Sequence, residues 1–276
     1  MRRKSRNQKE QTVMELMYKN ASRLDARDYA SGYLYLALNI GEEMLMCGAE
    51  VNRVEDSVRR ICTAYGAERV DVFSITSSIV VTMYGPEFGS LTQTRRISKQ
   101  STDMYRLDRL NQLSRDICES VPPLEEASEK LKEINNSRGY STGIRLVIYA
   151  VVSASFTVFF GGNWQDALVS GVLGMILMFL ERLLDSYDVN PFLSAFLFSL
   201  LGGFGAIFAV EHGLACSMDK ISIGNIMLRI PGIMLTNSIR DFFNGDTMTG
   251  ILRFLEAAFL SMTIAFGFVV AAAVWQ

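Results

Sequence analysis

The pattern of hydrophobic and polar positions divides this chain into two halves that differ in kind. Up to about residue 142, apolar residues recur at helical or strand spacing with charged residues between them. Beyond that point the chain consists of long apolar stretches joined by short polar links. A helix that spans a bilayer needs about 20 mostly apolar residues. Stretches near 143–161, 166–184, 191–210, 221–240 and 250–274 meet this requirement, which predicts an all-α polytopic membrane domain of about five transmembrane helices.

The first half has the pattern of a small water-soluble domain. Apolar residues at helical spacing predict one helix before Gly48 and a second that ends at Gly66. Residues 69–75 and 79–84 are rich in β-branched and aromatic residues, which predicts a β-hairpin, and 91–97 is a candidate third strand. A further helix is expected over 103–120. The predicted fold is an α+β cytoplasmic domain, in the order α-α-β-β-(β)-α, over 26–120, after a flexible basic tail at 1–25.

A connector of residues 121–142 joins the two halves. Pro122 and Pro123 end the preceding helix, and an amphipathic helix follows them. Such a helix could pack on the soluble domain or lie on the membrane surface. The sequence leaves both placements open, because its several glutamates would be repelled by anionic lipid.

Composition and charge exclude several classes of function. The 27 Lys and Arg residues nearly balance the 29 Asp and Glu residues, so nothing points to nucleic acid as a partner. The four cysteines form no Cys-x-x-Cys pair and the chain has a single histidine, which argues against a metal site; no cofactor is expected. The cysteines are interpreted as small buried apolar residues. The polar, basic N-terminus is not a secretory signal peptide.

Basic residues also predict the orientation of the spans. In a five-span arrangement they gather on one side of the membrane, and only Lys220 lies on the other. Because basic residues favour the cytoplasmic side, the N-terminal domain is expected in the cytoplasm and Gln276 outside, in the cell (inner) membrane. The residues on the cytoplasmic side are Lys130, Lys132, Arg138, Arg145, Arg182, Arg240 and Arg253.

The fourth predicted span is interrupted by Pro231 and Gly232, and polar residues follow the interruption. Broken helices beside polar groups form the binding sites of many transporters. Arg240 could hold a substrate carboxylate, and Glu256 could carry a coupling proton. A packing kink with interfacial charges is the alternative. The candidate transport path consists of Pro231, Gly232, Thr236, Asn237, Ser238, Arg240, Asp241, Asp246 and Glu256.

Several of these segments resemble one known family. In the soluble half they are 48–60 (GAEVNRVEDSVRR), 66–73 (GAERVDVF), 94–97 (TRRI) and 110–115 (LNQLSR). In the membrane half they are 230–241 (IPGIMLTNSIRD), 245–250 (GDTMTG) and 255–257 (LEA). Over about residues 30 to 275 the chain is similar to the threonine/serine exporter family, and it resembles the larger subunit of the family's split form.

The resemblance implies proton-driven export of small hydrophilic metabolites, threonine and serine above all, with dicarboxylates for some split members. It also implies a small hydrophobic partner of about four spans, because fused members carry that further domain and this chain ends after the fifth span. A homo-oligomer is a further expectation. Arg229 departs from the family pattern, where an apolar residue is expected. Pairing with Glu211, with Asp219 or with a partner residue, and snorkelling outward, all remain open.

Two other functions compete with transport. The soluble domain could be a membrane-anchored hydrolase, although no positioned nucleophile and base appear and no phosphate loop is present, so the chain is expected not to be an enzyme. It could instead be a regulatory or assembly module. The candidate motif or interface for either role consists of Gly48, Glu50, Arg53, Glu55 and Asp56.

Overall fold

The computed structural model describes residues 25–97, 101–137 and 139–275. The predicted basic tail therefore lies outside the described residues, apart from its last position. The chain forms two compact units. The first runs to Ser137 and also contains Arg240–Gly250, and the second contains Arg138–Ile239 and Ile251–Gln276. Each unit is described by itself.

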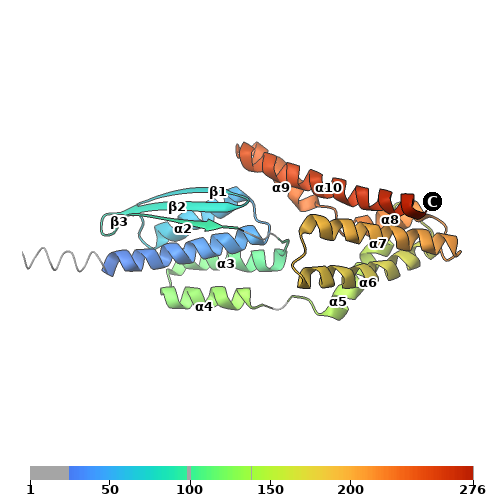
Figure 1. The fold of residues 1–276 in the computed structure, drawn as a ribbon. Helices are drawn as coiled ribbons and strands as arrows, with labels where there is room; N and C mark the ends of the chain where they lie inside the picture. The colour runs from blue at the N-terminus through green and yellow to red at the C-terminus, as the bar shows by residue number, and fades with distance from the viewer. Residues whose placement is uncertain (1–24, 98–100, 138, 276) are drawn as a thin grey trace, which may run out of the picture. The chain divides into compact units, whose positions relative to one another are not determined.

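The first unit places helices against one face of a small antiparallel sheet (Figure 1). The strand order is β1-β2-β3, so each strand pairs with its neighbour in the sequence. The three-stranded sheet is confirmed, including the strand that was only a candidate. The elements in chain order are a helix over residues 25–46, α2 (Val51–Ala64), β1 (Arg69–Ile75), β2 (Ser78–Gly85), β3 (Gly89–Arg96), α3 (Met104–Ser120) and α4 (Leu124–Asn135).

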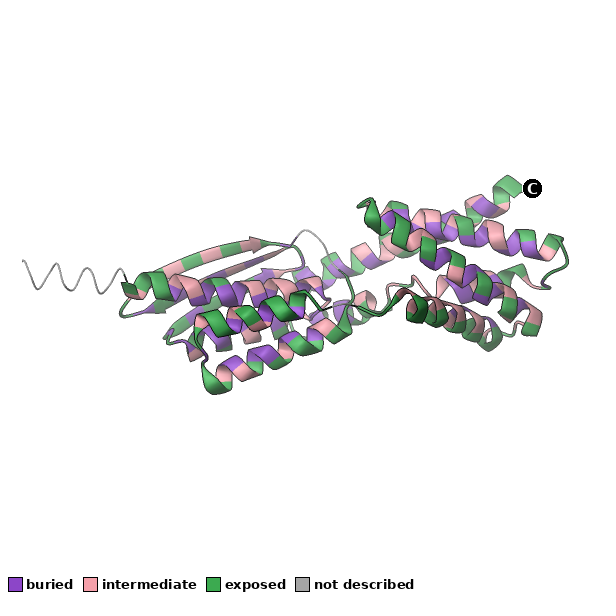
Figure 2. Ribbon diagram, turned by 90° about the horizontal axis from the view of Figure 1, so that it is seen from below, coloured by how far each residue is buried: buried purple, intermediate pink, exposed green. Residues whose placement is uncertain are grey.

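Alternation along the central strand explains why the sheet has one buried face. Ile79, Val81 and Met83 of β2 are fully buried in the core, whereas the residues between them are more accessible (Figure 2). Successive side chains of a strand point to opposite faces, so a period of two buries one face only. On the outer face, Phe73 of β1 is 65% exposed.

Two glycines shape the helices beneath the sheet. A Cβ atom at Gly41 would lie 2.7 Å from a methyl group of Val58, so the helix 25–46 approaches α2 too closely for any side chain there. Gly48 has φ +91°, a left-handed conformation that favours glycine and ends the helix. The chain can then turn at once into α2.

The amphipathic connector helix α4 belongs to the core of the first unit. Ala127, Leu131 and Ile134 are buried in the same cluster as the residues of α2 and α3. The hydroxyl of Tyr65 donates a hydrogen bond of 2.7 Å to the Pro122 carbonyl oxygen, which fixes the entry to this helix. Of the two placements open from sequence, the structure therefore has the helix packed on the first unit.

The cysteines only partly match their interpretation as buried apolar residues. Cys47 and Cys62 are buried, but Cys118 is partly accessible and Cys216 is exposed. Burial raises the pKa of Cys47 to about 11 and that of Cys62 to about 12. These two thiols are consequently protonated and unreactive at neutral pH.

The second unit is entirely helical in its described part. It contains α5 (Thr142–Phe159), α6 (Trp164–Ser186), α7 (Pro191–Glu211), α8 (Met218–Ile226), most of α9 (Gly232–Phe243) and most of α10 (Thr247–Trp275). Among the described residues, four helices are long and apolar enough to span a membrane, namely α5, α6, α7 and α10. The stretch 221–240 forms two shorter helices instead, so the count of five spans stays a prediction.

The outer surface of the second unit is apolar. Val147, Phe159 and Phe179 are each more than half exposed, and they belong to the helices α5 and α6. Large exposed apolar surfaces mark contact with lipid or with another protein. Together with the length of the helices, this surface identifies a multi-pass membrane protein.

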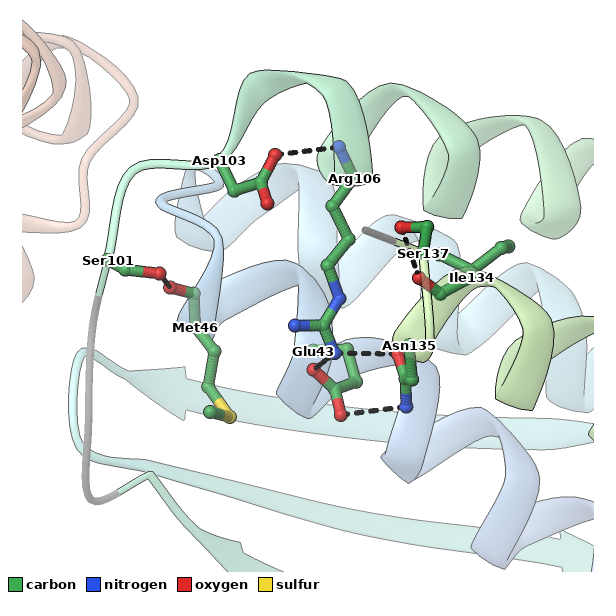
Figure 3. Close-up of polar contacts among 8 residues, drawn as sticks. All are labelled: Glu43, Met46, Ser101, Asp103, Arg106, Ile134, Asn135 and Ser137. Atoms are coloured by element: carbon green, nitrogen blue, oxygen red, sulfur yellow. Dashed lines mark hydrogen bonds and ion pairs between the residues drawn. The ribbon is translucent and has the colours of Figure 1, made fainter. Parts of the chain in front are cut away.

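A partly buried polar network joins the N-terminal helix, α3 and α4 in the first unit (Figure 3). The guanidinium group of Arg106 donates to the carboxylate of Glu43 and to the Asn135 side-chain oxygen, the latter at 2.7 Å. The Asn135 amide in turn donates to Glu43 at 2.9 Å. At the start of α3, Asp103 accepts the Arg106 backbone N–H, which caps the helix.

Loss of the arginine in this network should destabilise the first unit. In Arg106→Ala, the carboxylate of Glu43 stays partly buried without its cation, which costs about 1–3 kcal/mol. We expect a lower apparent melting temperature of the full chain in detergent. Arg109→Ala is the matched control, because Arg109 lies in the same helix and donates to the exposed Tyr105 hydroxyl. Equal melting temperatures for the two variants would contradict this role of the network.

Candidate polar seam in the membrane unit

Polar side chains meet inside the second unit, between α5, α6 and α8. Ser153, Thr157, Ser170 and Asn225 are all fully buried. The Ser153 hydroxyl donates to the Asn225 side-chain oxygen at 3.2 Å, and the Thr157 hydroxyl donates to Ser170 at 2.8 Å. The Asn225 amide donates to Ser170 at 3.2 Å and to the Ile221 carbonyl oxygen at 2.9 Å. The four groups thus satisfy one another away from water.

A charged pair lies beside this network. The Arg229 guanidinium contacts the Glu181 carboxylate of α6 at 2.7 Å, and the two side chains are 20% and 14% exposed. Arg229 also donates to the Ser194 hydroxyl of α7 at 2.8 Å, and it lies over the ring of Phe198. The Tyr149 hydroxyl of α5 donates to the other Glu181 oxygen. Arg229 therefore has a partner that none of the sequence alternatives named.

The network and the pair form one continuous row, which we call the polar seam. Its members follow helical spacing: three on α5 are four residues apart, and Asn225 precedes Arg229 by four. From Asp166 to Glu181, α6 rises about 22 Å at about 1.5 Å per residue, most of the thickness of a bilayer core. The seam consists of Tyr149, Ser153, Thr157, Asp166, Ser170, Glu181, Asn225 and Arg229.

One end of the seam is fixed by a buried carboxylate. Asp166 accepts the backbone N–H groups of Cys216 at 2.7 Å and Ser217 at 3.0 Å, just before α8. It also closes a capping box with Asn163 at the start of α6. All of these donors are backbone groups, so this carboxylate is held in place by the fold around it.

Two glycines, which have no side chain, let the helices of the seam approach closely. A Cβ atom at Gly224 of α8 would lie 2.7 Å from the Ser153 carbonyl oxygen, and one at Gly174 of α6 would lie 2.9 Å from the Tyr149 carbonyl oxygen. Small residues bring helix backbones together in membranes. These two glycines therefore position α6 and α8 against α5, so that the polar groups can meet.

The path residues predicted from sequence are divided between the two units. In the second unit, Pro231 and Gly232 lie where an irregular stretch, 227–231, leads into α9. Beyond them, the Thr236 hydroxyl donates to the Gly232 carbonyl and the Ser238 hydroxyl to the Leu235 carbonyl. Their hydroxyls therefore bond to their own helix. Asn237 is buried, and Glu256 lies half-buried on α10.

The remaining path residues, Arg240, Asp241 and Asp246, belong to the first unit. There the Arg240 guanidinium forms an ion pair with the carboxylate of Glu50, at the start of α2. Asp241 is fully buried, and its backbone carbonyl oxygen accepts the Asp246 backbone N–H at 2.9 Å. Arg240 was predicted to hold a substrate carboxylate, but in this structure a carboxylate of the protein occupies it.

The soluble motif lies around the beginning of α2, where Gly48 forms the preceding turn. Glu55 accepts the Ser74 backbone N–H at 2.7 Å and the Ser74 hydroxyl at 3.1 Å, which ties α2 to β1. Burial raises the pKa of Glu55, and the Ser74 hydrogen bonds oppose that change. Arg53 is exposed, and Asp56 forms an exposed ion pair with Arg60.

Sequence reasoning missed most of the seam. Glu181 lies within a predicted span, next to Arg182, and was not singled out. The signal that could have found it was the spacing of Tyr149, Ser153 and Thr157 within an otherwise apolar helix. No cluster of residues suited to a metal ion occurs within 25–97, 101–137 and 139–275.

A charged pair buried among long apolar helices is typical of the interior of a transporter. The fold and the seam thus define a multi-pass membrane protein of the transporter class. Comparison with family models gives the family: the chain belongs to the ThrE family, described as "Putative threonine/serine exporter", whose model matches residues 35–275.

Curated relatives are consistent with this assignment. The "Threonine/serine exporter" of Corynebacterium glutamicum is 23% identical over 253 residues, covering 88% of this chain and 52% of the relative. The "Probable succinate transporter subunit YjjP" of Escherichia coli K12 is 22% identical over 245 residues, covering 87% of this chain and 93% of the relative. The chain spans about half the length of the first and nearly all of the second. These relatives are named as transporters, not enzymes.

Solved structures add nothing to these comparisons, because none matches the chain.

Filling the contact between α5 and α8 should disrupt the seam. In Gly224→Val, the new side chain would collide with the Ser153 carbonyl, and overpacking of this kind costs about 1–3 kcal/mol. We expect a lower melting temperature in detergent. Gly143→Val is the matched control, because a Cβ atom there meets nothing within 4 Å. If Gly224→Val melted no lower than the control, this glycine would not be needed for close packing.

Proposed function

We propose that this chain is a subunit of a secondary exporter that moves a small polar metabolite out of the cell. The observation that carries the proposal is the Glu181–Arg229 pair, held in an apolar helical unit of a family described as exporters. Ionisable groups are costly inside a membrane and commonly mark a solute or ion path. Threonine, serine, a related amino acid or a dicarboxylate are the candidate substrates, since relatives are named for both chemistries.

In the proposed arrangement five spans cross the inner membrane, with α8 and α9 together forming the interrupted one. The first unit then lies in the cytoplasm and Gln276 outside. The proposed path follows the polar seam and includes the interruption at Pro231 and Gly232. Thr236, Asn237 and Ser238 beyond it and Glu256 on α10 complete the path. The chemistry of broken helices supports this placement, because their free backbone groups can bind a solute.

The proposed exporter also contains a small hydrophobic partner of about four spans. The word "subunit" in the name of the Escherichia coli relative, most of whose length this chain covers, supports this part of the proposal. Energy is proposed to come from the proton gradient, because the seam offers an intramembrane carboxylate that can exchange a proton.

Export can be measured in cells that produce this chain together with a small, four-span membrane protein encoded next to it. We expect the rate of efflux of serine, threonine or a dicarboxylate, after loading of the cells, to rise several-fold above that of cells with an empty vector. Cells that produce only one of the two proteins are the controls. No increase for any of these solutes would count against the exporter.

The same cells test the energy source. A protonophore should reduce efflux to the control rate when it is added together with an outside pH below the inside pH. Efflux that continued unchanged would exclude the proton gradient as the driving force and leave the exporter itself intact.

A regulatory role of the first unit is the second candidate function. It is favoured by the ion pair between Arg240, in the last turn of α9, and Glu50 at the start of α2. The Arg240 side chain is 53% exposed and that of Glu50 is 16% exposed, so water reaches one side of the pair and weakens it. A contact this weak can open and close readily, as a gate requires.

A double-mutant cycle separates gating from substrate binding at Arg240. We expect Glu50→Gln and Arg240→Gln to change the export rate by the same factor, and the double variant to match either single variant, because all three remove one contact. Asp56→Gln, in the same helix, is the control for charge. If Arg240→Gln abolished export while Glu50→Gln had no effect, Arg240 would instead act on the substrate.

A further inference from the structure

The Glu181–Arg229 pair places one negative and one positive group side by side on two separate elements. Glu181 belongs to the regular helix α6, whereas Arg229 belongs to the irregular stretch 227–231. In that stretch the Leu228 and Arg229 N–H groups bond to carbonyls three residues back. Such 3-10-type turns are wound more tightly than an α-helix, but the geometry of their hydrogen bonds is poorer. The pair can therefore part by movement of one side without unwinding a long helix.

Stability alone gives a weak reason for this pair to exist. The desolvation of two charges in apolar surroundings can cost as much as their attraction returns, so buried ion pairs are poor evidence of stabilisation. The surroundings here are apolar, since Phe198 and Leu177 are buried nearby in the core of α6, α7 and α8. A role that uses both charges explains their presence better.

The two charges match the head group of an α-amino acid, which carries one ammonium and one carboxylate. A zwitterion between the pair would give Arg229 a new carboxylate and Glu181 a new cation, so neither buried charge would lose its partner. A dicarboxylate could satisfy only Arg229, and its second carboxylate would face Glu181. Arg is also well suited to bind a carboxylate through two parallel hydrogen bonds.

We infer that Glu181 and Arg229 form the receptor for the zwitterionic head of an α-amino acid, and that a proton competes with the substrate ammonium for Glu181. The inference rests on the proposed exporter and names its substrate class. Once protonated, Glu181 is neutral and no longer holds an ammonium group. Occupation by substrate and by proton is then mutually exclusive, which is the condition for exchanging an inward proton for an outward amino acid.

Few other groups around Glu181 can titrate. Arg229 is its ion partner, Tyr149 of α5 donates to it, and Arg145 of α5 lies beside Tyr149. From α7 the neighbours of the pair are Ser194 and Phe198, which do not titrate. Arginine and tyrosine keep their protons throughout the acid and neutral range. A pH dependence in that range would therefore report on Glu181.

Binding to the full-length chain, purified in detergent with its partner, provides the test. Radiolabelled L-threonine is the probe, and its unlabelled competitors are L-threonine methyl ester, 3-hydroxybutyrate and succinate. We expect L-threonine to bind and none of the three competitors to displace it, because each lacks one of the two charges or carries the wrong one. Displacement by succinate as effective as by unlabelled L-threonine would overturn the zwitterion receptor.

Single variants test the roles of Glu181 and Arg229 separately. Glu181→Gln should bind L-threonine about tenfold more weakly, as expected for a lost charge-assisted hydrogen bond, and should lose the decrease of affinity on acidification that the natural chain shows. Arg229→Gln should not bind. Glu211→Gln and Arg182→Gln, both at exposed positions, are the matched controls and should bind normally. A Glu181→Gln variant that kept the same pH dependence would overturn the proton competition.

Exchanging the two charged residues with each other tests whether the pair binds substrate or only stabilises the fold. The double variant Glu181→Arg with Arg229→Glu keeps an ion pair, so a merely structural role predicts normal L-threonine export. The receptor role predicts no L-threonine export, because the site for the ammonium group and the site for the carboxylate group have exchanged places while the rest of the seam is unchanged. Should the double variant not fold, Arg229→Lys keeps the charge without the paired geometry: weakened binding supports the receptor and unchanged binding opposes it.

Export by cells that produce the unmodified chain with its partner distinguishes a failure of this inference from a failure of the proposed exporter. Export of succinate but not of any amino acid would refute the zwitterion receptor and leave the exporter standing. Export of no solute at all would refute the proposed function, and with it the inference.

Discussion

The interior of a bilayer offers no water to polar groups, and the second unit is organised around that constraint. Its polar side chains point at one another across α5, α6 and α8, and its outer surface is apolar. Glycines at 174 and 224 bring the backbones close enough for short side chains to meet. The hydrogen bonds between these helices thus depend on the two glycines, where a larger residue would push the backbones apart.

The same constraint explains where the chain departs from regular helix. Arg229 could not be accommodated in the membrane unit without a partner, and the structure supplies Glu181, Ser194 and the face of Phe198 from two other helices. The irregular stretch 227–231 lets this one residue reach all three. The stretch is only partly covered by protein, since Ile230 is 42% exposed, but the Leu228 and Arg229 N–H groups bond to carbonyls three residues back.

Local pattern predicted the elements better than their partners. Runs of β-branched and aromatic residues identified the strands, and the Pro231–Gly232 interruption was visible, because both are properties of neighbouring residues. The partner of Arg229 could not be found in this way, since Glu181 is 48 residues away in the sequence. Arg240, in the last turn of α9, pairs with Glu50, which is distant in sequence, so only the tertiary fold specifies this contact.

The uneven exposure of the cysteines has a practical consequence. Cys47 and Cys62 are buried thiols with raised pKa values, whereas Cys216 is exposed in the link between α7 and α8. Partly accessible Cys118 lies in the soluble unit, where burial raises its pKa as well. A thiol reagent that cannot cross membranes would therefore modify Cys216 in intact cells only if that link faces outward, so the natural chain carries its own label for determining which way it is inserted.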